Sequence, residues 1–207
     1  MDEIGFANRI EWHRPWLKSI RDLALSLLSQ HDWLTAVNEA AQRYALTNAE
    51  GSPIRFVQQQ TLPAGVAYEA HIYATGAVPT RDNLHDFFNA LIWLRFPQTK
   101  RTLNKLQAME LQRMQALNSN GVRGGQRDAA TLFDENAALL VCSDSSLVEA
   151  LRRHEWDEVF LRNRDNFIKN SEVILFGHAL LEKLVRPYKA ITAHAWVVIV
   201  EPDWQRL

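Results

Sequence analysis

The sequence predicts a single α+β domain over residues 1–207, in which short strands are interleaved with helices after a helical N-terminal part. The chain has 207 residues, 47% apolar and 23% charged, which is typical of one globular domain with a sizeable core. Apolar residues recur at helical spacing over long stretches, whereas the strand-like runs are short. These runs do not form a regular strand–helix–strand repeat, so we expect α+β rather than a parallel α/β sheet.

The N-terminal part, about residues 1–48, is predicted to be helical. Pro15 stands where the first turn of a helix tolerates proline, and apolar residues follow at helical spacing as far as Leu28. Asp32 is expected to cap a second helix that ends near Tyr44. A cluster of turn-forming residues at 48–53 separates these helices from the rest of the chain.

The remaining part, about residues 54–200, mixes the two periodicities. Strands are predicted at 54–57, 67–73, 129–133, 137–141, 172–176 and 196–200, and the third and fourth would form a hairpin around 134–136. Helices are predicted at 83–95, 97–117, 145–153, 156–162 and 177–186. Gly76 and Pro79 are assigned to a loop.

Charge and cysteine content narrow the class of protein. Lys and Arg number 23 and Asp and Glu 24, so the net charge of -1 does not indicate a nucleic-acid or membrane partner. The single cysteine, Cys142, excludes a disulfide framework and is expected to be a small buried apolar residue. The first residues lack the features of a secretion signal, and no apolar run is long enough to span a bilayer. We therefore expect a cytoplasmic protein without a membrane segment.

Histidines and carboxylates at helical spacing form the first candidate site. His178 and Glu182 are one helical turn apart, and His85 lies on the polar face of another predicted helix. Such a pair on a solvated helix often only stabilises that helix. If the fold brings these residues together with others, imidazoles and a carboxylate could hold Zn, Mn or Fe. The candidate ligands are His85, His178, Glu182, His71 and His194.

Two carboxylates at the predicted hairpin tip, Asp134 and Glu135, form the second candidate site. Adjacent carboxylates at the end of a strand can serve as a general base or bind a hard cation. Asp is also an ordinary turn residue, selected for local hydrogen bonds, so both explanations remain open. Arg127 is a candidate for holding an anionic substrate, such as a phosphoester, through paired hydrogen bonds.

A third feature is a basic stretch at residues 95–127. Its bases are Arg95, Lys100, Arg101, Lys105, Arg113, Arg123 and Arg127, and Glu110 is its single acid, so its local charge is +6. This stretch could bind nucleic acid or an acidic partner, or it could be an ordinary solvated face. Its single aromatic residue, Phe96, is expected to pack inside, which leaves no aromatic ring for stacking with bases.

Three runs of sequence, at 83–104, 127–136 and 176–194, together resemble the domain-of-unknown-function 3025 family. The resemblance implies a bacterial, cytoplasmic protein and brings no assigned activity, substrate or mechanism. It also implies that the polar residues of these runs share one site. These residues are His85, Asp86, Asn89, Arg127, Asp128, Asp134, Glu135, His178, Glu182 and His194.

Three functions therefore remain open at this stage. The first is a metal-dependent hydrolase, with the histidines and Glu182 as ligands and Asp134 or Glu135 as the general base. The second is a binding module without enzymatic activity, which would use the basic 95–127 surface. The third is a buried hydrogen-bond network that only holds the fold together. An enzyme requires its polar residues in a concave pocket, whereas a module requires its bases on one exposed face.

Overall fold

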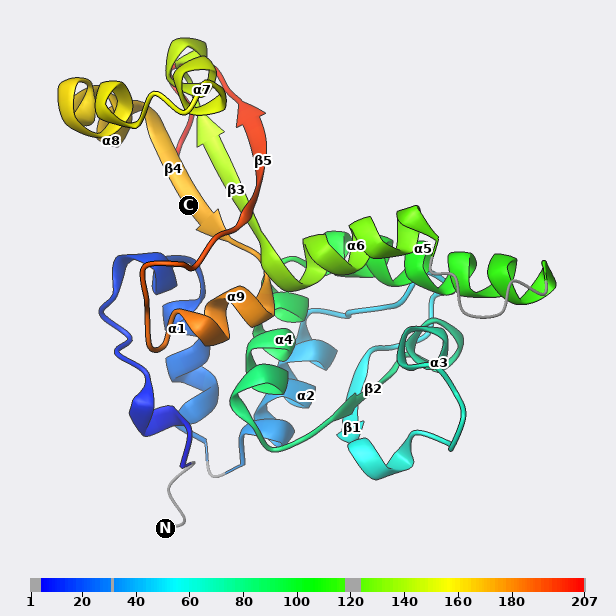
Figure 1. The fold of residues 1–207 in the computed structure, drawn as a ribbon. Helices are drawn as coiled ribbons and strands as arrows, with labels where there is room; N and C mark the ends of the chain where they lie inside the picture. The colour runs from blue at the N-terminus through cyan, green and yellow to red at the C-terminus, as the bar shows by residue number, and fades with distance from the viewer. Residues whose placement is uncertain (1–4, 31, 118–123, 207) are drawn as a thin grey trace.

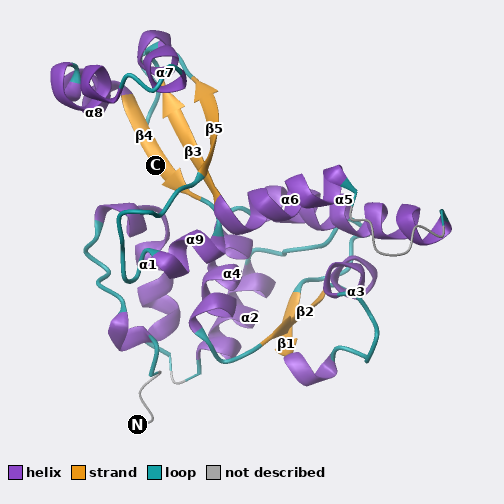
Figure 2. Ribbon diagram, viewed as in Figure 1, coloured by secondary structure: helices purple, strands orange, loops and turns teal. Residues whose placement is uncertain are grey.

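Two parts can be distinguished in the fold, a mostly helical body and a smaller lobe built on a three-stranded sheet (Figure 1, Figure 2). The computed structural model describes residues 5–30, 32–117 and 124–206. Within these ranges, the helical body comprises residues 5–136 and 176–193, and the sheet lobe comprises residues 137–175 and 194–206. The arrangement confirms the α+β class.

The helical body contains seven α-helices and two short strands among the described residues. The helices are α1 (Lys18–Leu28), α2 (Trp33–Arg43), α3 (Tyr68–Thr75), α4 (Leu84–Arg95), α5 (Pro97–Ala116), α6 (Gly125–Asn136) and α9 (His178–Lys183). The strands β1 (Arg55–Gln58) and β2 (Ala77–Thr80) pair in parallel, with Arg55 opposite Ala77. Short 3-10 turns lie at Ala7–Arg9, Pro15–Leu17 and Gln59–Thr61.

Helix α4 lies at the centre of the helical body. It contacts α1, α2, α5 and α9, and it is buried along nearly its whole length, including Phe87, Phe88 and Trp93. Because α4 is packed against four other helices, its burial fixes the position of its first turn. The caps follow the sequence: Asp32 accepts from two amides of α2, as predicted, and Asn83 accepts from the amide of Asp86 in α4.

The sheet lobe projects from the helical body (Figure 1). Its central strand β3 (Ala137–Cys142) pairs antiparallel with β4 (Ser171–Leu175) and parallel with β5 (His194–Ile199). Helices α7 (Ser145–Arg152) and α8 (Arg164–Asn170) and a π-helical turn (Glu158–Arg162) connect β3 to β4. Cys142 is buried, as expected, with Leu147 and Val148.

The predicted strand at 67–73 is wrong, because these residues form the start of α3. A short apolar run fits either period, and packing decides between them. Here the segment packs on α5 and β2 and buries Ile72. The helix ends at Gly76, whose φ of +71° is left-handed. Pro79, assigned to a loop, lies in β2.

The predicted hairpin at 129–141 is also wrong. Residues Gly125–Asn136 form helix α6, which packs along α5 and continues directly into β3 (Figure 1). Ala130 and Asp134, one helical turn apart, are its buried residues. Asp134 and Glu135 therefore lie in the last turn of a helix instead of at a hairpin tip. Helix α8 was missed by the sequence prediction.

Candidate metal centre

The candidate site lies where α4, α6 and α9 meet inside the helical body. His85 comes from the first turn of α4, Glu135 from the last turn of α6, and His178 from the first position of α9. One possible ligand atom from each of these three residues lies within 4.8 Å of the other two. No other group of this kind, formed by three or more His, Cys, Asp or Glu residues, occurs in the described part of the chain. These three residues are called the triad below.

His178 is oriented by a main-chain carbonyl. Its Nδ1 lies 2.9 Å from the carbonyl oxygen of Asp134, which only accepts, so Nδ1 carries the hydrogen and Nε2 carries the lone pair. Nε2 lies 3.7 Å from Oε2 of Glu135. Burial of the ring lowers the pKa of His178 to about 4. The imidazole is therefore neutral at neutral pH, which is the form that binds metals.

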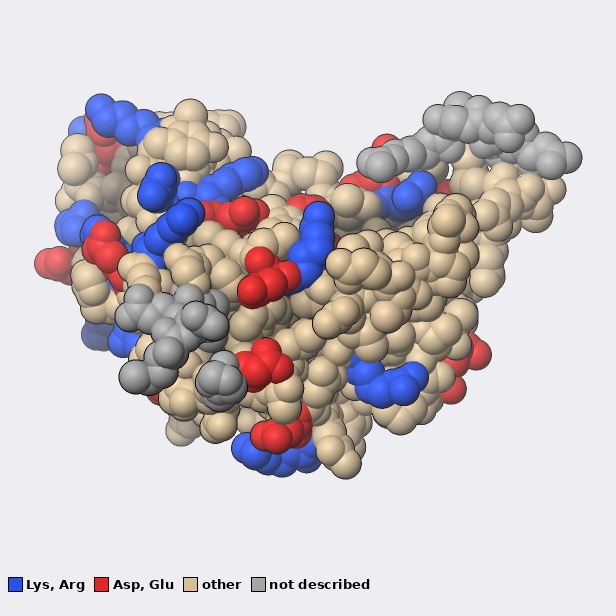
Figure 3. All heavy atoms as spheres, turned by 90° about the horizontal axis from the view of Figure 1, so that it is seen from below, with Lys and Arg blue, Asp and Glu red and all other residues tan. Residues whose placement is uncertain are grey.

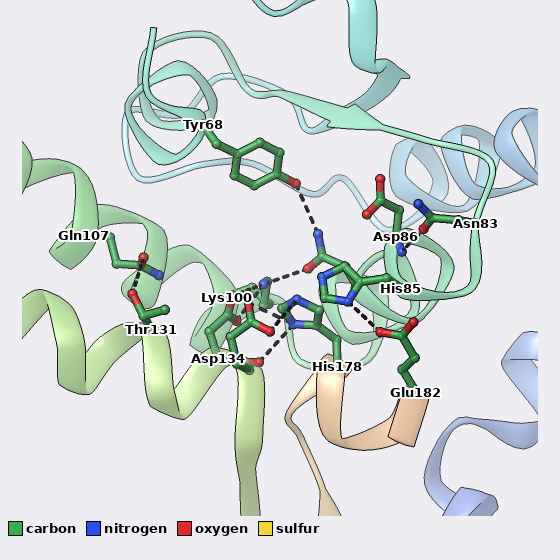
Figure 4. Close-up of polar contacts among 12 residues, drawn as sticks. Tyr68, Asn83, His85, Asp86, Lys100, Gln107, Thr131, Asp134, His178 and Glu182 are labelled. Carbon is green, nitrogen blue, oxygen red and sulfur yellow. Dashed lines mark hydrogen bonds and ion pairs between the residues drawn. The ribbon is translucent and has the colours of Figure 1, made fainter. Parts of the chain in front are cut away.

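His85 is oriented by a carboxylate. Its Nδ1 donates to Oε2 of Glu182 at 2.8 Å, so in the neutral form of this ring, the form that binds metals, the lone pair is on Nε2. The rings of His85 and His178 lie 4.6 Å apart between centroids, at 75° to each other. Figure 4 shows the nitrogen of His85 that is not bonded to Glu182 on the side of His178. Glu182, predicted as a ligand, thus lies behind His85, and Glu135 supplies the carboxylate of the triad.

A buried ammonium group holds the end of α6 in place. Nζ of Lys100 donates to both carboxylate oxygens of Asp134, at 2.6 and 2.8 Å, and to Oδ1 of Asn89 at 2.8 Å. It also lies 5.4 Å from the centre of the Trp93 ring. All three N–H groups of the ammonium are used, and both oxygens of Asp134 are engaged. Asn89 in turn donates to the hydroxyl of Tyr68 at 3.2 Å, as Figure 4 shows.

A pocket of about 290 Å³ opens beside the triad. Its lining residues come from the segment after β1, from β2 and the residue that follows it, and from α3, α4, α6 and α9: Gln59, Leu62, Tyr68, Glu69, Pro79, Arg81, His85, Asp86, Asn89, Asp134, Glu135 and His178. A larger hollow of about 780 Å³ lies between α2 and β1 but contains no histidine. The smaller pocket is the functional candidate although its volume is lower, because the triad lies at its wall and several of its titratable groups have shifted pKa values.

Glu69 is a pocket residue that the sequence analysis missed. Its Oε2 accepts from the side-chain amide of Asn104 at 2.7 Å, and Oε1 has no hydrogen-bond partner among the described residues. Burial and the neighbouring Asp134 raise the pKa of Glu69. The residue was missed because its segment was assigned to a strand, which left no reason to place it beside the helices. Lys100 was counted only as part of a basic surface, although it stands in the first family-like run.

Three of the predicted site residues lie outside this arrangement. His71 is on α3 and His194 is exposed at the start of β5, and neither belongs to the triad. Arg127 lies on α6, seven residues before Asp134, and does not line the pocket. Its charge reaches Glu69, where it opposes part of the rise in pKa.

The basic 95–127 stretch does not form one continuous exposed face. Lys100 is buried, Arg95 donates from Nε to the carbonyl of Ser19 at 3.0 Å, and Arg113 pairs with Glu110. Arg123 lies outside the described residues. On the side of the molecule drawn in Figure 3, basic and acidic side chains are interspersed. Phe96 packs against Phe176, as expected, with ring centroids 5.6 Å apart.

Comparison with known proteins supports the resemblance found in the sequence. The model of the family described as "Protein of unknown function (DUF3025)" matches residues 54–207, a range that includes the whole triad and every residue lining the pocket. No curated protein and no solved structure matches the chain. No described helix is both long enough and apolar enough to cross a membrane. The chain belongs to the DUF3025 family of proteins of unknown function.

Proposed function

We propose that this protein is a metal-dependent enzyme of the hydrolase type, in which His85, His178 and Glu135 bind a divalent transition metal. The observation that carries this proposal is the convergence of three ligand atoms within 4.8 Å at the wall of a pocket of about 290 Å³. Three protein ligands leave coordination positions for water and substrate, which is the usual arrangement of catalytic rather than structural sites. Zn, Mn and Fe all accept this set of ligands.

The orientation of the two histidines supports a metal more than a purely structural network. Each ring donates Nδ1–H to an oxygen behind it, on Glu182 or on the main chain of Asp134. Such hydrogen bonds fix the tautomer and direct Nε2 toward a metal. Two lone pairs and a carboxylate would then face one another, and that is unfavourable unless a cation or a proton lies between them.

The metal would lower the pKa of a bound water and supply hydroxide near neutral pH. Of the two carboxylates first considered as the base, Glu135 is required as a ligand and Asp134 is engaged by Lys100. Glu69 lines the same pocket with one oxygen available, so we assign it the role of general base. Glu69 would take a proton from a water molecule as the oxygen of that water attacks an acyl or phosphoryl centre, and would then pass this proton to the leaving group.

Metal binding tests this proposal directly. The purified protein, freed of metal by chelation and carrying no histidine tag, is titrated with Zn²⁺, Mn²⁺ and Fe²⁺, and bound metal is measured by elemental analysis. We expect about one metal per chain and its loss in His85→Ala, His178→Ala and Glu135→Ala. Glu182→Gln should weaken binding by about 10- to 100-fold, because it removes only an orienting partner.

His194→Ala is the matched control, because it removes a histidine that lies outside the triad. Binding lost equally in His194→Ala, or absent in the wild type, would overturn the metal site. Selective binding of Fe²⁺ would favour oxygen chemistry over hydrolysis, since two histidines and one carboxylate also form the iron site of oxygenases. With Zn²⁺ or Mn²⁺ bound, hydrolysis of p-nitrophenyl acetate and bis(p-nitrophenyl) phosphate is measured next.

The alternative of a binding module has less support. Lys100, one of the bases it would use, is fully engaged inside the protein, and Arg95 and Arg113 already have partners. Arg101 and Lys105 remain as candidates for an acidic or nucleic-acid partner. Binding of RNA or DNA that is lost with rising salt and in the double variant Arg101→Gln/Lys105→Gln would revive this alternative.

A further inference from the structure

An arginine at the pocket wall is held in place by a buried carboxylate. Asp86, only 6% exposed, accepts from the main-chain N–H of Arg81 at 2.6 Å and from its Nε and Nη2, both at 3.0 Å. The amide of Asp86 is bonded in turn to the capping side chain of Asn83 at 2.8 Å. The guanidinium is therefore fixed on the first turn of α4, the same turn that carries His85.

This contact uses only part of the hydrogen-bonding capacity of Arg81. A guanidinium has five N–H groups in a planar fork, and the carboxylate of Asp86 takes one from Nε and one from Nη2. The other three have no acceptor among the described residues, and the side chain is 58% exposed. The unused N–H groups of Nη1 and Nη2 lie side by side, which is the geometry that binds two oxygens of one anion.

The charges of the other pocket residues show why Arg81 is the group that can bind an anion. The other charged side chains that line it are the carboxylates Glu69, Asp86, Asp134 and Glu135. Asp86 is neutralised by Arg81 and Asp134 by Lys100, and a divalent metal would offset the charges of the remaining two. Arg81 is thus the lining cation that still has N–H groups available to an anion, whereas Arg127 does not line the pocket.

We propose that Arg81 is the substrate-anchoring residue of the pocket and that it binds the oxyanion of a small substrate, a carboxylate or a phosphate, through its outer N–H pair. As an assignment of substrate class, the inference rests on the proposed function. Anion binding itself does not require the metal, because Arg81 and Asp86 form the anchor from protein groups alone. A small substrate fits a pocket of about 290 Å³, which is at the lower end of ligand sites.

Calorimetric titration with inorganic phosphate and with acetate tests the proposal, with chelator-treated and with metal-loaded protein. We expect Arg81→Gln to weaken binding of at least one probe by about 10- to 100-fold in both forms, as expected for the loss of a charge-assisted pair of hydrogen bonds. Arg127→Gln is the matched control and should bind as the wild type does. Comparison of phosphate with acetate shows which oxyanion the site prefers.

Arg81→Lys serves as a second variant in case Arg81→Gln unfolds by leaving Asp86 unpaired. It keeps a positive charge beside Asp86 but lacks the fork, so it should fold and still bind the anion more weakly than the wild type. Wild-type affinity in Arg81→Lys, loss of binding in Arg127→Gln instead, or no binding of either probe by the wild type would each overturn the proposal. If the metal site fails its own test while Arg81-dependent anion binding persists, only the proposed hydrolase is lost.

Discussion

The helical body and the sheet lobe differ in the size of their buried cores and in the polar groups that these cores hold. The helical body has a continuous core around α4, and a buried ion pair and a triad of potential ligands are set into it. The core of the lobe is a small cluster around Cys142. Several of its large apolar side chains are exposed: Trp156, Phe160, Leu161, Ile168, Val173, Trp196 and Ile199.

This difference shows why the candidate site lies in the helical body. Holding ligand atoms close together requires side chains whose rotamers are fixed by packing and by hydrogen bonds, and the large core of the body provides both at the ends of α4, α6 and α9. The two parts nevertheless meet at the site. The chain enters the lobe at Ala137, two residues after Glu135, and returns to the body at Phe176, two residues before His178.

The largest expected effect comes from removing the buried ion pair of the helical body. Lys100→Met leaves the carboxylate of Asp134 buried without its partner, and we expect a loss of about 3–5 kcal/mol in the free energy of unfolding. The matched change in the lobe is Arg162→Met, which breaks the exposed pair with Glu158 and should cost less than about 1 kcal/mol. Urea denaturation measures the free energy of unfolding of both variants. Equal losses in the two would contradict the difference expected between a buried and an exposed ion pair.

Lowering the pH should reduce the free energy of unfolding, because His178 resists protonation in the folded protein. Its pKa of about 4 in the folded protein lies below the usual value of 6.5, so below pH 6.5 the unfolded chain binds a proton that the folded chain does not. Stability is therefore retained above pH 6.5 and falls toward pH 4, by about 3 kcal/mol for this residue in metal-free protein. His178→Asn should lack that part of the slope, and an unchanged slope would refute the assignment.

Substitution of Gly177 tests how closely the two parts must pack at their junction. A Cβ atom there would lie 2.5 Å from the carbonyl oxygen of Glu135 and 2.6 Å from the main-chain nitrogens of Asn136 and Ala137. We expect Gly177→Ala to shift the end of α6, to cost about 1–3 kcal/mol and to weaken metal binding measurably. Gly125→Ala, at the other end of α6, meets nothing within 4 Å and is the control. Wild-type metal affinity in Gly177→Ala would show that the end of α6 tolerates the shift.

The smallest effect is expected on the surface of the lobe. Leu161 is 71% exposed, and Leu161→Ser should change the free energy of unfolding by no more than about 0.5 kcal/mol. Thermal denaturation and metal titration should both match the wild type. A loss above about 1 kcal/mol would indicate that the side chain is covered in solution, and the small core of the lobe would then not be its whole stabilisation.

Local sequence was sufficient for the features that depend on neighbouring residues. The α+β class, the cap at Asp32, the helix at 83–95 and the break at Pro97 follow from periodicity and from backbone chemistry within a few positions. The sequence also identified His85 and His178 as candidate ligands, because imidazoles on helices of otherwise apolar motifs are chemically conspicuous.

Tertiary structure decided what depends on residues far apart in the chain. Packing against α5 made helices of the segments at 67–73 and 129–133, whose short apolar runs fit either period. The packing of the helices on one another also placed Glu135 in the triad, Glu182 behind His85, and Lys100 against Asp134. His85 and His178 are 93 positions apart in the sequence, and their rings touch only because a common core buries α4 and α9 against each other. No local pattern records that contact, since burial of the whole chain determines it.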